Sequence, residues 1–445
     1  MTQLNKRITL YGLTMIAVGS SIGSGIFVTP GTIAHEIPNA WLILMVWLLG
    51  GLVGLCGALT FSELGGLFTR AGGVYVYLKN AYGPLAGFLY GWVMLVVINT
   101  GSLAGLCVAF AEYLKFFLPG LSQGMKMAVA AGTMIVLTGI NILGVHYSQW
   151  LSNVLTTLKV GAILVIVMIG LFAGNDAVIQ QNFYTATAIP EHLFTALFSG
   201  MIGVFFSVGG WHHATYVAGE VINPGKNVAR AMILGTSIIT LAYVTINLAY
   251  LRLLPVEVIA GTQTAASDAV STVFPWAGRL VAIGIALSIF GTISIYTMSA
   301  PRIYYAMAED GLFFKSMARV HPLWKTPVVA MMIQAVWALC ILFFFQAYFD
   351  QIITFVTFMD ALFFALAAGS VFVFRKIMKD EPRPYRVWGY PVIPLVFIGL
   401  YSVFAINVFF QKPQQALPGL VLMAAGIGVY YWFSKIKGAG KKGNP

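Results

Sequence analysis

Long apolar runs separated by short polar connections dominate the chain. A helix needs about 20 apolar residues to cross about 30 Å of hydrocarbon, and the 445 residues contain twelve runs of this kind. The twelve predicted spans lie near residues 9–35, 41–68, 84–117, 125–143, 148–173, 192–221, 228–251, 276–307, 327–346, 350–374, 391–410 and 416–433. The pattern therefore predicts an all-α polytopic membrane protein with twelve transmembrane helices.

Two of these spans are interrupted by small, flexible residues. The first contains GSSIGSG at residues 19–25, and the sixth contains FSVGGW at residues 206–211. Helix packing explains a single glycine cluster, but these two clusters lie five spans apart, in helices that cross the membrane in opposite directions. Broken helices at matching positions of two inverted halves are typical of transporters that bind their substrate at the middle of the bilayer.

An unwound turn exposes backbone groups that can bind an amino acid. The free N–H groups at the start of the second half-helix, with its positive dipole end, suit a carboxylate, and the carbonyls that end the first half-helix suit an ammonium group. A sugar or a nucleoside would need polar side chains along the cavity, and the chain has few. No phosphate-binding loop, paired carboxylates or metal-spaced His/Cys cluster occurs in the sequence.

Composition and charge support the membrane assignment. Hydrophobic residues make up 59% and charged residues 9% of the chain, whereas soluble domains carry about 25% charged residues. A soluble enzyme, a disordered regulator and a nucleic-acid reader are therefore excluded. When the net charge of +11 is sorted by span, 19 of the 25 basic residues fall on the side of the N-terminus. This asymmetry predicts that both termini lie in the cytoplasm, and we expect the protein in the cell membrane. The opposite side holds Lys115, Lys126, Arg252, Arg279 and Lys412.

Several motifs, in order along nearly the whole chain, resemble one transporter family. They are IGSGIFVTP at 22–30, GGVY at 72–75, GPLAGF at 83–88, Phe206 with GGW at 209–211, EVINP at 220–224, SAPR at 299–302, and HP and TP at 321–322 and 326–327. The chain resembles the amino acid–polyamine–organocation superfamily, and within it the L-type amino-acid transporters.

The resemblance implies a LeuT-like fold with a 5+5 inverted repeat and discontinuous helices 1 and 6. The first repeat would occupy residues 1–175 and the second 190–375, and residues 390–445 would form the last two helices and the tail. The activity implied is sodium-independent exchange of neutral amino acids, with no cofactor and no metal.

The resemblance also carries site residues over. The backbone of Gly23, Ser24 and Gly25 would hold the substrate carboxylate. The carbonyls of Ser21, Phe206 and Gly209 would hold the amine, and the Phe206 ring would act as the gate. The family usually has isoleucine where Ser21 stands, and this change matters little if only the carbonyl binds.

Lys159 is the one basic residue that the topology does not explain. It lies about eleven residues into the fifth span, where an ionised lysine costs at least about 2.5–3.5 kcal/mol. The resemblance implies that this lysine takes the place of a coupling sodium ion and tethers helix 5 to the first half-helix. We therefore expect Lys159 to couple substrate binding to closure.

Other polar residues within the spans are candidates with structural alternatives. His212 stands where the family usually has asparagine, and it either contacts the substrate side chain or bonds to neighbouring helices. The same choice applies to Asn99 and Ser102, and His213 points to another side of its helix. Asp360 is costly within the tenth span, and the sequence names no partner for it.

The predicted function is antiport of neutral, small amino acids by alternating access, because no carboxylate stands at either break to attract a cationic side chain. Large neutral amino acids are the second choice. One alternative is a proton-coupled symporter or uniporter in which Lys159 or Asp360 titrates. A membrane-embedded enzyme would need convergent acid or base groups, which the scattered histidines do not supply.

The outer loop at 118–124 lacks the cysteine through which eukaryotic L-type members pair with a glycoprotein. The expected partners are therefore amino acids and the lipid bilayer.

Overall fold

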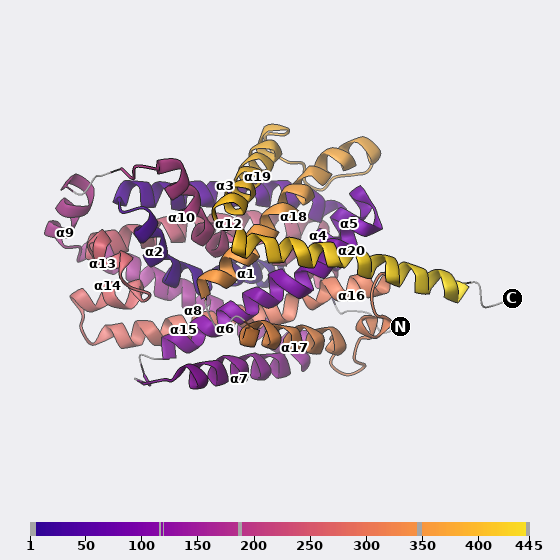
Figure 1. Ribbon diagram of the computed structural model, residues 1–445, viewed down its shortest axis with the longest axis horizontal. Helices are drawn as coiled ribbons and strands as arrows, with labels where there is room; N and C mark the ends of the chain where they lie inside the picture. The colour runs from indigo at the N-terminus through magenta and orange to yellow at the C-terminus, as the bar shows by residue number, and fades with distance from the viewer. Residues whose placement is uncertain (1–5, 115–116, 119, 186–188, 345–348, 442–445) are drawn as a thin grey trace.

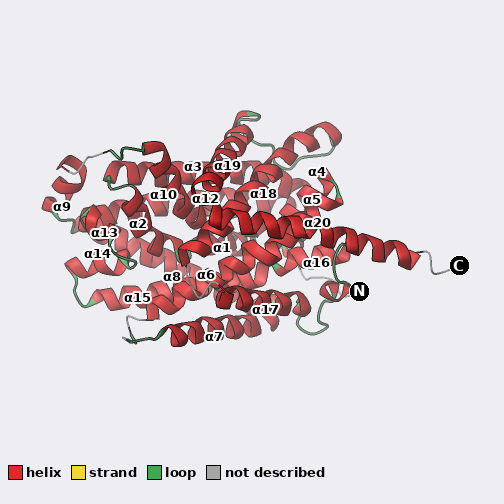
Figure 2. Ribbon diagram, in the orientation of Figure 1, coloured by secondary structure: helices red, strands yellow, loops and turns green. Residues whose placement is uncertain are grey.

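The computed structural model describes residues 6–114, 117–118, 120–185, 189–344 and 349–441, and the regular elements in these ranges are helices (Figure 2). The predicted outer residue Lys115 lies outside the described residues. Within the described ranges, ten helical segments are long and apolar enough to cross a membrane, and two shorter apolar helices, α10 and α17, accompany them. The predicted all-α polytopic fold is confirmed.

The helices follow the predicted spans closely. Those of the first half are α1 (Leu10–Ser21), α2 (Gly25–Glu36), α3 (Ala40–Leu67), α4 (Val74–Tyr82), α5 (Pro84–Val93), the π-helix η1 (Met94–Ile98), α6 (Asn99–Leu114), α7 (Gln123–Ile142), α8 (Val145–Phe172), α9 (Asp176–Gln180) and η2 (Gln181–Thr185). Those that follow are α10 (Leu193–Val208), α11 (His213–Tyr216), η3 (Ala218–Glu220), α12 (Pro224–Leu253), α13 (Val256–Ala260), α14 (Ala265–Val273), α15 (Ala277–Ser299), α16 (Pro301–Glu309), η4 (Lys315–Ala318), α17 (Val328–Phe344), α18 (Phe349–Ile377), α19 (Val392–Gln411) and α20 (Pro413–Lys441).

Local sequence signals set many of the helix ends. The side chains of Thr9, Asn39 and Ser122 accept hydrogen bonds from backbone N–H groups in the first turns of α1, α3 and α7. These caps satisfy donors that have no partner inside the helix. Pro84 and Pro224 begin α5 and α12, where a missing N–H costs nothing.

The broken helices lie at the centre of the bundle. α1 packs against α12, α8 and α15, and α10 packs against α2 and α3. In Figure 1, α7 and α17 lie together along the lower edge, and α9, α13 and α14 gather at the end opposite the N-terminus. We refer to the end that carries the N-terminus as the terminal end and to the other as the distal end.

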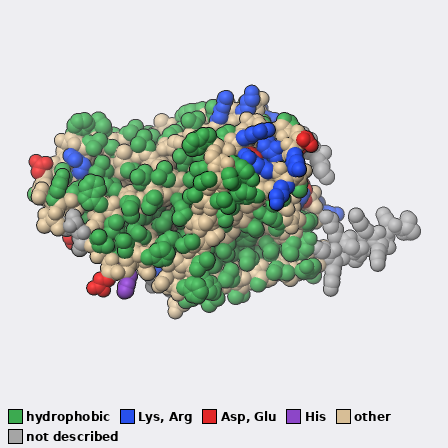
Figure 3. Space-filling model, turned by 90° about the horizontal axis from the view of Figure 1, so that it is seen from above, with side chains coloured by type: hydrophobic (Ala, Val, Ile, Leu, Met, Phe, Trp, Pro, Cys, Tyr) green, Lys and Arg blue, Asp and Glu red, His purple; other side chains and the backbone are tan. Residues whose placement is uncertain are grey.

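The outer surface is inverted relative to that of a soluble protein. Large apolar side chains such as Phe172 and Phe410 are 80% and 72% exposed, whereas Ser24, Asn99 and Arg302 are fully buried. Figure 3 shows an apolar surface along the molecule, with Lys and Arg side chains gathered towards the terminal end. This distribution suits a lipid-facing belt between two polar ends.

Candidate functional site

The first helix break lies between α1 and α2. α1 ends at Ser21 and α2 begins at Gly25, so the first N–H groups of α2 have no acceptor within their own helix. Ser24 is fully buried, and its Oγ has no hydrogen-bond partner among the described residues. A buried hydroxyl beside free amide groups can serve an anionic ligand, as expected for the predicted carboxylate residues Gly23, Ser24 and Gly25.

The second break follows α10 and contacts the first. α10 ends at Val208, and Gly210 has a φ of 104°. The Ser20 Oγ donates a hydrogen bond of 2.8 Å to the Gly210 carbonyl, and a Cβ on Gly210 would lie 2.7 Å from the carbonyl carbon of Ser20. Glycine is therefore required here both by the backbone angle and by the close approach of the two breaks.

Tyr243 of α12 joins the two breaks, and sequence reasoning did not identify it. Its hydroxyl lies 2.7 Å from the Ser21 carbonyl and 3.0 Å from the Ser207 carbonyl. The Gly23 N–H also donates to the Ser21 carbonyl, at 2.8 Å. The phenol has one proton and donates to one of its two carbonyls at a time. When it donates to Ser21, both lone pairs of this carbonyl are engaged, and the predicted contact with a substrate amine requires the phenol to turn to Ser207 or the Gly23 bond to open. The Gly209 carbonyl, by contrast, accepts no hydrogen bond in the described part of the chain. Phe206, the predicted gate and third carbonyl, lies within the last turn of α10 and is partly exposed.

Lys159 of α8 reaches the first break. Its side chain is 1% exposed, and its Nζ donates to the carbonyls of Gly19 at 3.0 Å and Ile22 at 2.6 Å and to the Thr292 Oγ1 at 2.9 Å. The three bonds connect α8, the end of α1 and α15. The expected tether between the fifth span and the first half-helix is therefore present, and its role in transport stays a prediction.

One face of α6 contacts the first break through Leu106. A Cβ on Gly23 would lie 3.3 Å from the Leu106 side chain, and positions 99, 102 and 106 share one face of a helix. Asn99 and Ser102 are buried, and neither polar atom of the Asn99 side chain has a hydrogen-bond partner among the described residues. These two residues therefore stay candidates for the substrate pocket.

The two histidines have different surroundings. His212 is buried against the rings of Phe364 and Tyr216, and its Nδ1 has no partner in the described ranges. His213 Nδ1 lies 2.5 Å from the Ser299 Oγ, which is a structural contact between α11 and α15. His212 therefore stays a candidate for contact with the substrate side chain, whereas the His213 side chain bonds to a neighbouring helix.

Asp360 lies on α18 close to tyrosines of other helices. Phe363, one turn further along α18, packs against the Tyr90 ring with centroids 5.5 Å apart, and the Asp360 Oδ1 has no hydrogen-bond partner among the described residues. Tyr90 and Tyr216 bond to each other at 2.5 Å. Sequence reasoning singled out Asp360 and missed these neighbours, which come from two other helices.

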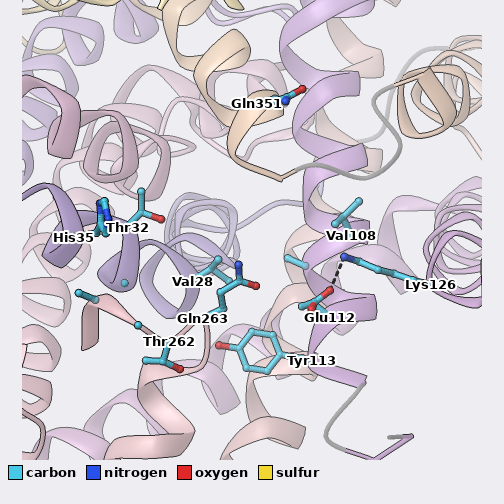
Figure 4. A pocket seen from close by; sticks show the side chains of 14 residues that line it. Val28, Thr32, His35, Val108, Glu112, Tyr113, Lys126, Thr262, Gln263 and Gln351 are labelled. Atoms are coloured by element: carbon cyan, nitrogen blue, oxygen red, sulfur yellow. Dashed lines mark ion pairs between the residues drawn. The ribbon is translucent and has the colours of Figure 1, made fainter. Parts of the chain in front are cut away.

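A cavity of about 560 Å³ opens at the distal end of the site. Figure 4 shows His35 and Thr32 of α2 on one side and Glu112 and Tyr113 of α6 on the other. The Tyr113 hydroxyl donates to the Phe27 carbonyl at 3.2 Å. The cavity therefore runs along α2 from the distal surface as far as Val28.

The terminal end of the site is closed by contacts of the N-terminal segment. The N–H groups of Arg7 and Ile8 each donate to the Glu220 carbonyl at 2.9 Å, and the Ile222 N–H donates back to Ile8. The Glu220 side chain binds Arg302, with Nε 2.8 Å from Oε1 and both side chains 1% exposed. The distal end thus has a cavity, which no residue of either break lines, whereas these contacts close the terminal end.

We predict that Arg302→Met destabilises the protein by about 3–5 kcal/mol, because it leaves the buried Glu220 carboxylate without its partner. The check is the midpoint of thermal unfolding of the purified protein in detergent. Arg230→Met removes an exposed arginine of α12 and serves as the control. Equal midpoints for the two variants would contradict the prediction.

The sequence was also compared with those of known proteins. A family model described as amino acid permease matches residues 8–432. The chain belongs to the amino acid permease family. It is therefore a multi-pass membrane carrier and not an enzyme.

Relatives within this family match this permease over nearly its full length. The serine/threonine exchanger SteT of Bacillus subtilis is 32% identical, over 98% of each chain. The human large neutral amino acids transporter small subunit 2 is 29% identical, over 98% of this chain and 82% of its own. The human b(0,+)-type amino acid transporter 1 is 27% identical, over 98% and 89%. These similarities agree with the resemblance to L-type transporters.

Proposed function

We propose that this permease exchanges neutral, small L-amino acids across the membrane without sodium. The observation that carries the proposal is the pair of touching helix breaks, with the Lys159 ammonium bound to the carbonyls of the first. An amino acid offers a carboxylate to the amides at the start of α2 and an ammonium to carbonyls across the break. Similarity to a serine/threonine exchanger supports small substrates.

The positive charge of Lys159 supports exchange without sodium. The Lys159 ammonium occupies a site built from two carbonyls and the Thr292 hydroxyl, and oxygen atoms of this kind also bind a hard cation. The ammonium group at this position then takes the place of a bound sodium ion. We propose that the two inverted repeats lie at residues 1–175 and 190–375, that both termini are cytoplasmic, and that the protein acts without a glycoprotein partner.

The test is uptake of labelled amino acids into liposomes containing the purified protein. We expect uptake of alanine, serine and threonine only when the liposomes are preloaded with unlabelled substrate, and no change when potassium replaces sodium outside. Uptake into empty liposomes, or uptake that requires sodium, would contradict the proposal. A panel with leucine, phenylalanine, lysine and glutamate defines the substrate range.

Proton-coupled symport is the second candidate. The Asp360 carboxyl favours it, because this half-buried acid lies within the tenth predicted span and its Oδ1 has no hydrogen-bond partner among the described residues. The same liposomes, empty of substrate, distinguish the two mechanisms. A symporter concentrates its substrate when the outside is made acidic, whereas an obligatory exchanger does not.

A further inference from the structure

A pocket at the terminal end of α18 is lined by basic side chains and lies far from the helix breaks. Its volume is about 210 Å³, and the described residues that line it are Arg375, Lys379, Arg383 and Arg386. Figure 3 shows a group of Lys and Arg side chains on this side of the molecule. Four cations around one small space repel each other unless an anion lies among them.

One carboxylate already holds two of these cations. Glu63 of α3 is 1% exposed, and its oxygens lie 2.7 Å from Arg375 Nη2 and 3.1 Å from Arg383 Nε. Its Oε2 also accepts the Val387 N–H at 2.8 Å. Arg383 in addition donates to the carbonyls of Phe374 and Met378 at the end of α18. These two arginines are therefore held in place by the fold.

The other two cations have no such compensation. Lys379 and Arg386 are exposed, and within the described part of the chain no carboxylate lies within ion-pair distance of either side chain. The four lining cations and Glu63 together carry a net charge of +3, and Asp380 and Glu381 follow Lys379 in the sequence without an ion pair to it. The donors of Arg383 are taken by Glu63 and by backbone carbonyls, whereas Arg375 Nη1 has no partner among the described residues. An anion with several oxygens can therefore be bound by Arg375 Nη1 together with Lys379 and Arg386.

Exposed apolar side chains lie close in sequence to the residues that line the pocket. Ile377, Trp388 and Val392 are 62%, 75% and 61% exposed, and the Arg375 guanidinium lies 3.7 Å from the centre of the Tyr390 ring. Tryptophan and tyrosine are enriched where a protein meets the lipid headgroups. A basic pocket at the end of a spanning helix, with exposed apolar side chains close to it in the sequence, therefore lies at headgroup depth.

We propose that this pocket binds the phosphate of an anionic phospholipid headgroup. Guanidinium groups match phosphate oxygens with paired hydrogen bonds, and basic pockets between membrane helices hold acidic headgroups. The lipid would join α18, the segment that follows it and α3, because Glu63 of α3 binds the same arginines. With the termini in the cytoplasm, the headgroup belongs to the inner leaflet. This orientation is part of the proposed function, whereas the binding site itself is independent of the substrate.

The test compares two double variants of the full-length protein in detergent. Lys379→Gln with Arg386→Gln removes the two free cations of the pocket, and Lys376→Gln with Arg319→Gln removes two exposed cations that do not line it. Native mass spectrometry measures the apparent Kd for phosphatidylglycerol and for phosphatidylcholine. Because all four side chains are exposed, both variants should unfold at the temperature of the wild type when no lipid is added.

We expect the wild type to prefer phosphatidylglycerol over phosphatidylcholine. The pocket variant should bind phosphatidylglycerol about 25-fold more weakly, at roughly fivefold for each basic residue near an anionic group, whereas the control variant should stay within about threefold of the wild type. Equal losses in the two variants would mean a general basic surface and would overturn the proposal. Displacement of the lipid by millimolar inorganic phosphate would also overturn it, because the site would then bind a soluble anion.

Discussion

Lys159→Ala should lower amino acid exchange in liposomes by tenfold or more. The Lys159 ammonium donates to two carbonyls at the end of α1 and to Thr292, and a hydrogen bond from a charged donor contributes about 1.5–3 kcal/mol. Without it, the Gly19 and Ile22 carbonyls share the single proton of the Thr292 hydroxyl. The end of α1 then loses its fixed position relative to α8, and substrate binding no longer drives closure.

The neighbouring Leu158→Ala provides the control. Leu158 belongs to the same helix and is 56% exposed, so its truncation should leave exchange unchanged. Initial rates are compared at equal amounts of reconstituted protein, with thermal unfolding in detergent as a check on folding. Wild-type exchange rates in Lys159→Ala would refute the coupling role. A variant that binds substrate normally but exchanges slowly would support it most directly.

Gly210→Ala should abolish exchange while leaving the protein folded. The added Cβ would lie 2.7 Å from the carbonyl carbon and oxygen of Ser20, and the φ of 104° disfavours any residue with a side chain. Insertion of a methyl group into packed structure costs about 1–3 kcal/mol. The two breaks must therefore separate, which moves the carbonyls of the second break away from the amides of the first.

Gly161→Ala is the matched control. A Cβ at Gly161 meets nothing within 4 Å, and alanine favours the α8 helix more than glycine does. We expect wild-type exchange and equal or higher thermal stability for this variant. Exchange by Gly210→Ala at the rate of Gly161→Ala would show that the contact between the two breaks is not needed for binding.

The sequence predicted the spans and the breaks well because both depend on local composition. The breaks are shorter than the glycine clusters suggest. Residues 19–21 remain helical, with the Ser20 hydroxyl bonded back to the Ile16 carbonyl. Likewise Phe206 is still helical, and the Gly209 N–H bonds to the Phe205 carbonyl. Side chains and the last helical N–H groups extend each helix into its own flexible segment, which composition alone does not reveal.

Contacts between residues far apart in the chain could not be predicted from the sequence. Tyr243 joins two carbonyls that are 222 and 36 residues away, and Glu220 meets Arg302 across 82 residues. Tyr243 has no local pattern that separates it from other tyrosines, and the EVINP and SAPR motifs that contain Glu220 and Arg302 do not show that these two residues meet. Lys159 was predictable because a charge in an apolar run is unusual by itself. Its partners were inferred only through family resemblance.

The bond between Tyr243 and Ser21 has a consequence for release of the cargo. Because the phenol and the Gly23 amide already pair with this carbonyl, a substrate ammonium group bound there, as we propose, would replace one bond with another. The net gain would then be the difference between two hydrogen bonds and not the full value of satisfying an empty acceptor. A carrier has to release its cargo on the far side of the membrane, and in the proposed mode of binding competition from Tyr243 favours that release.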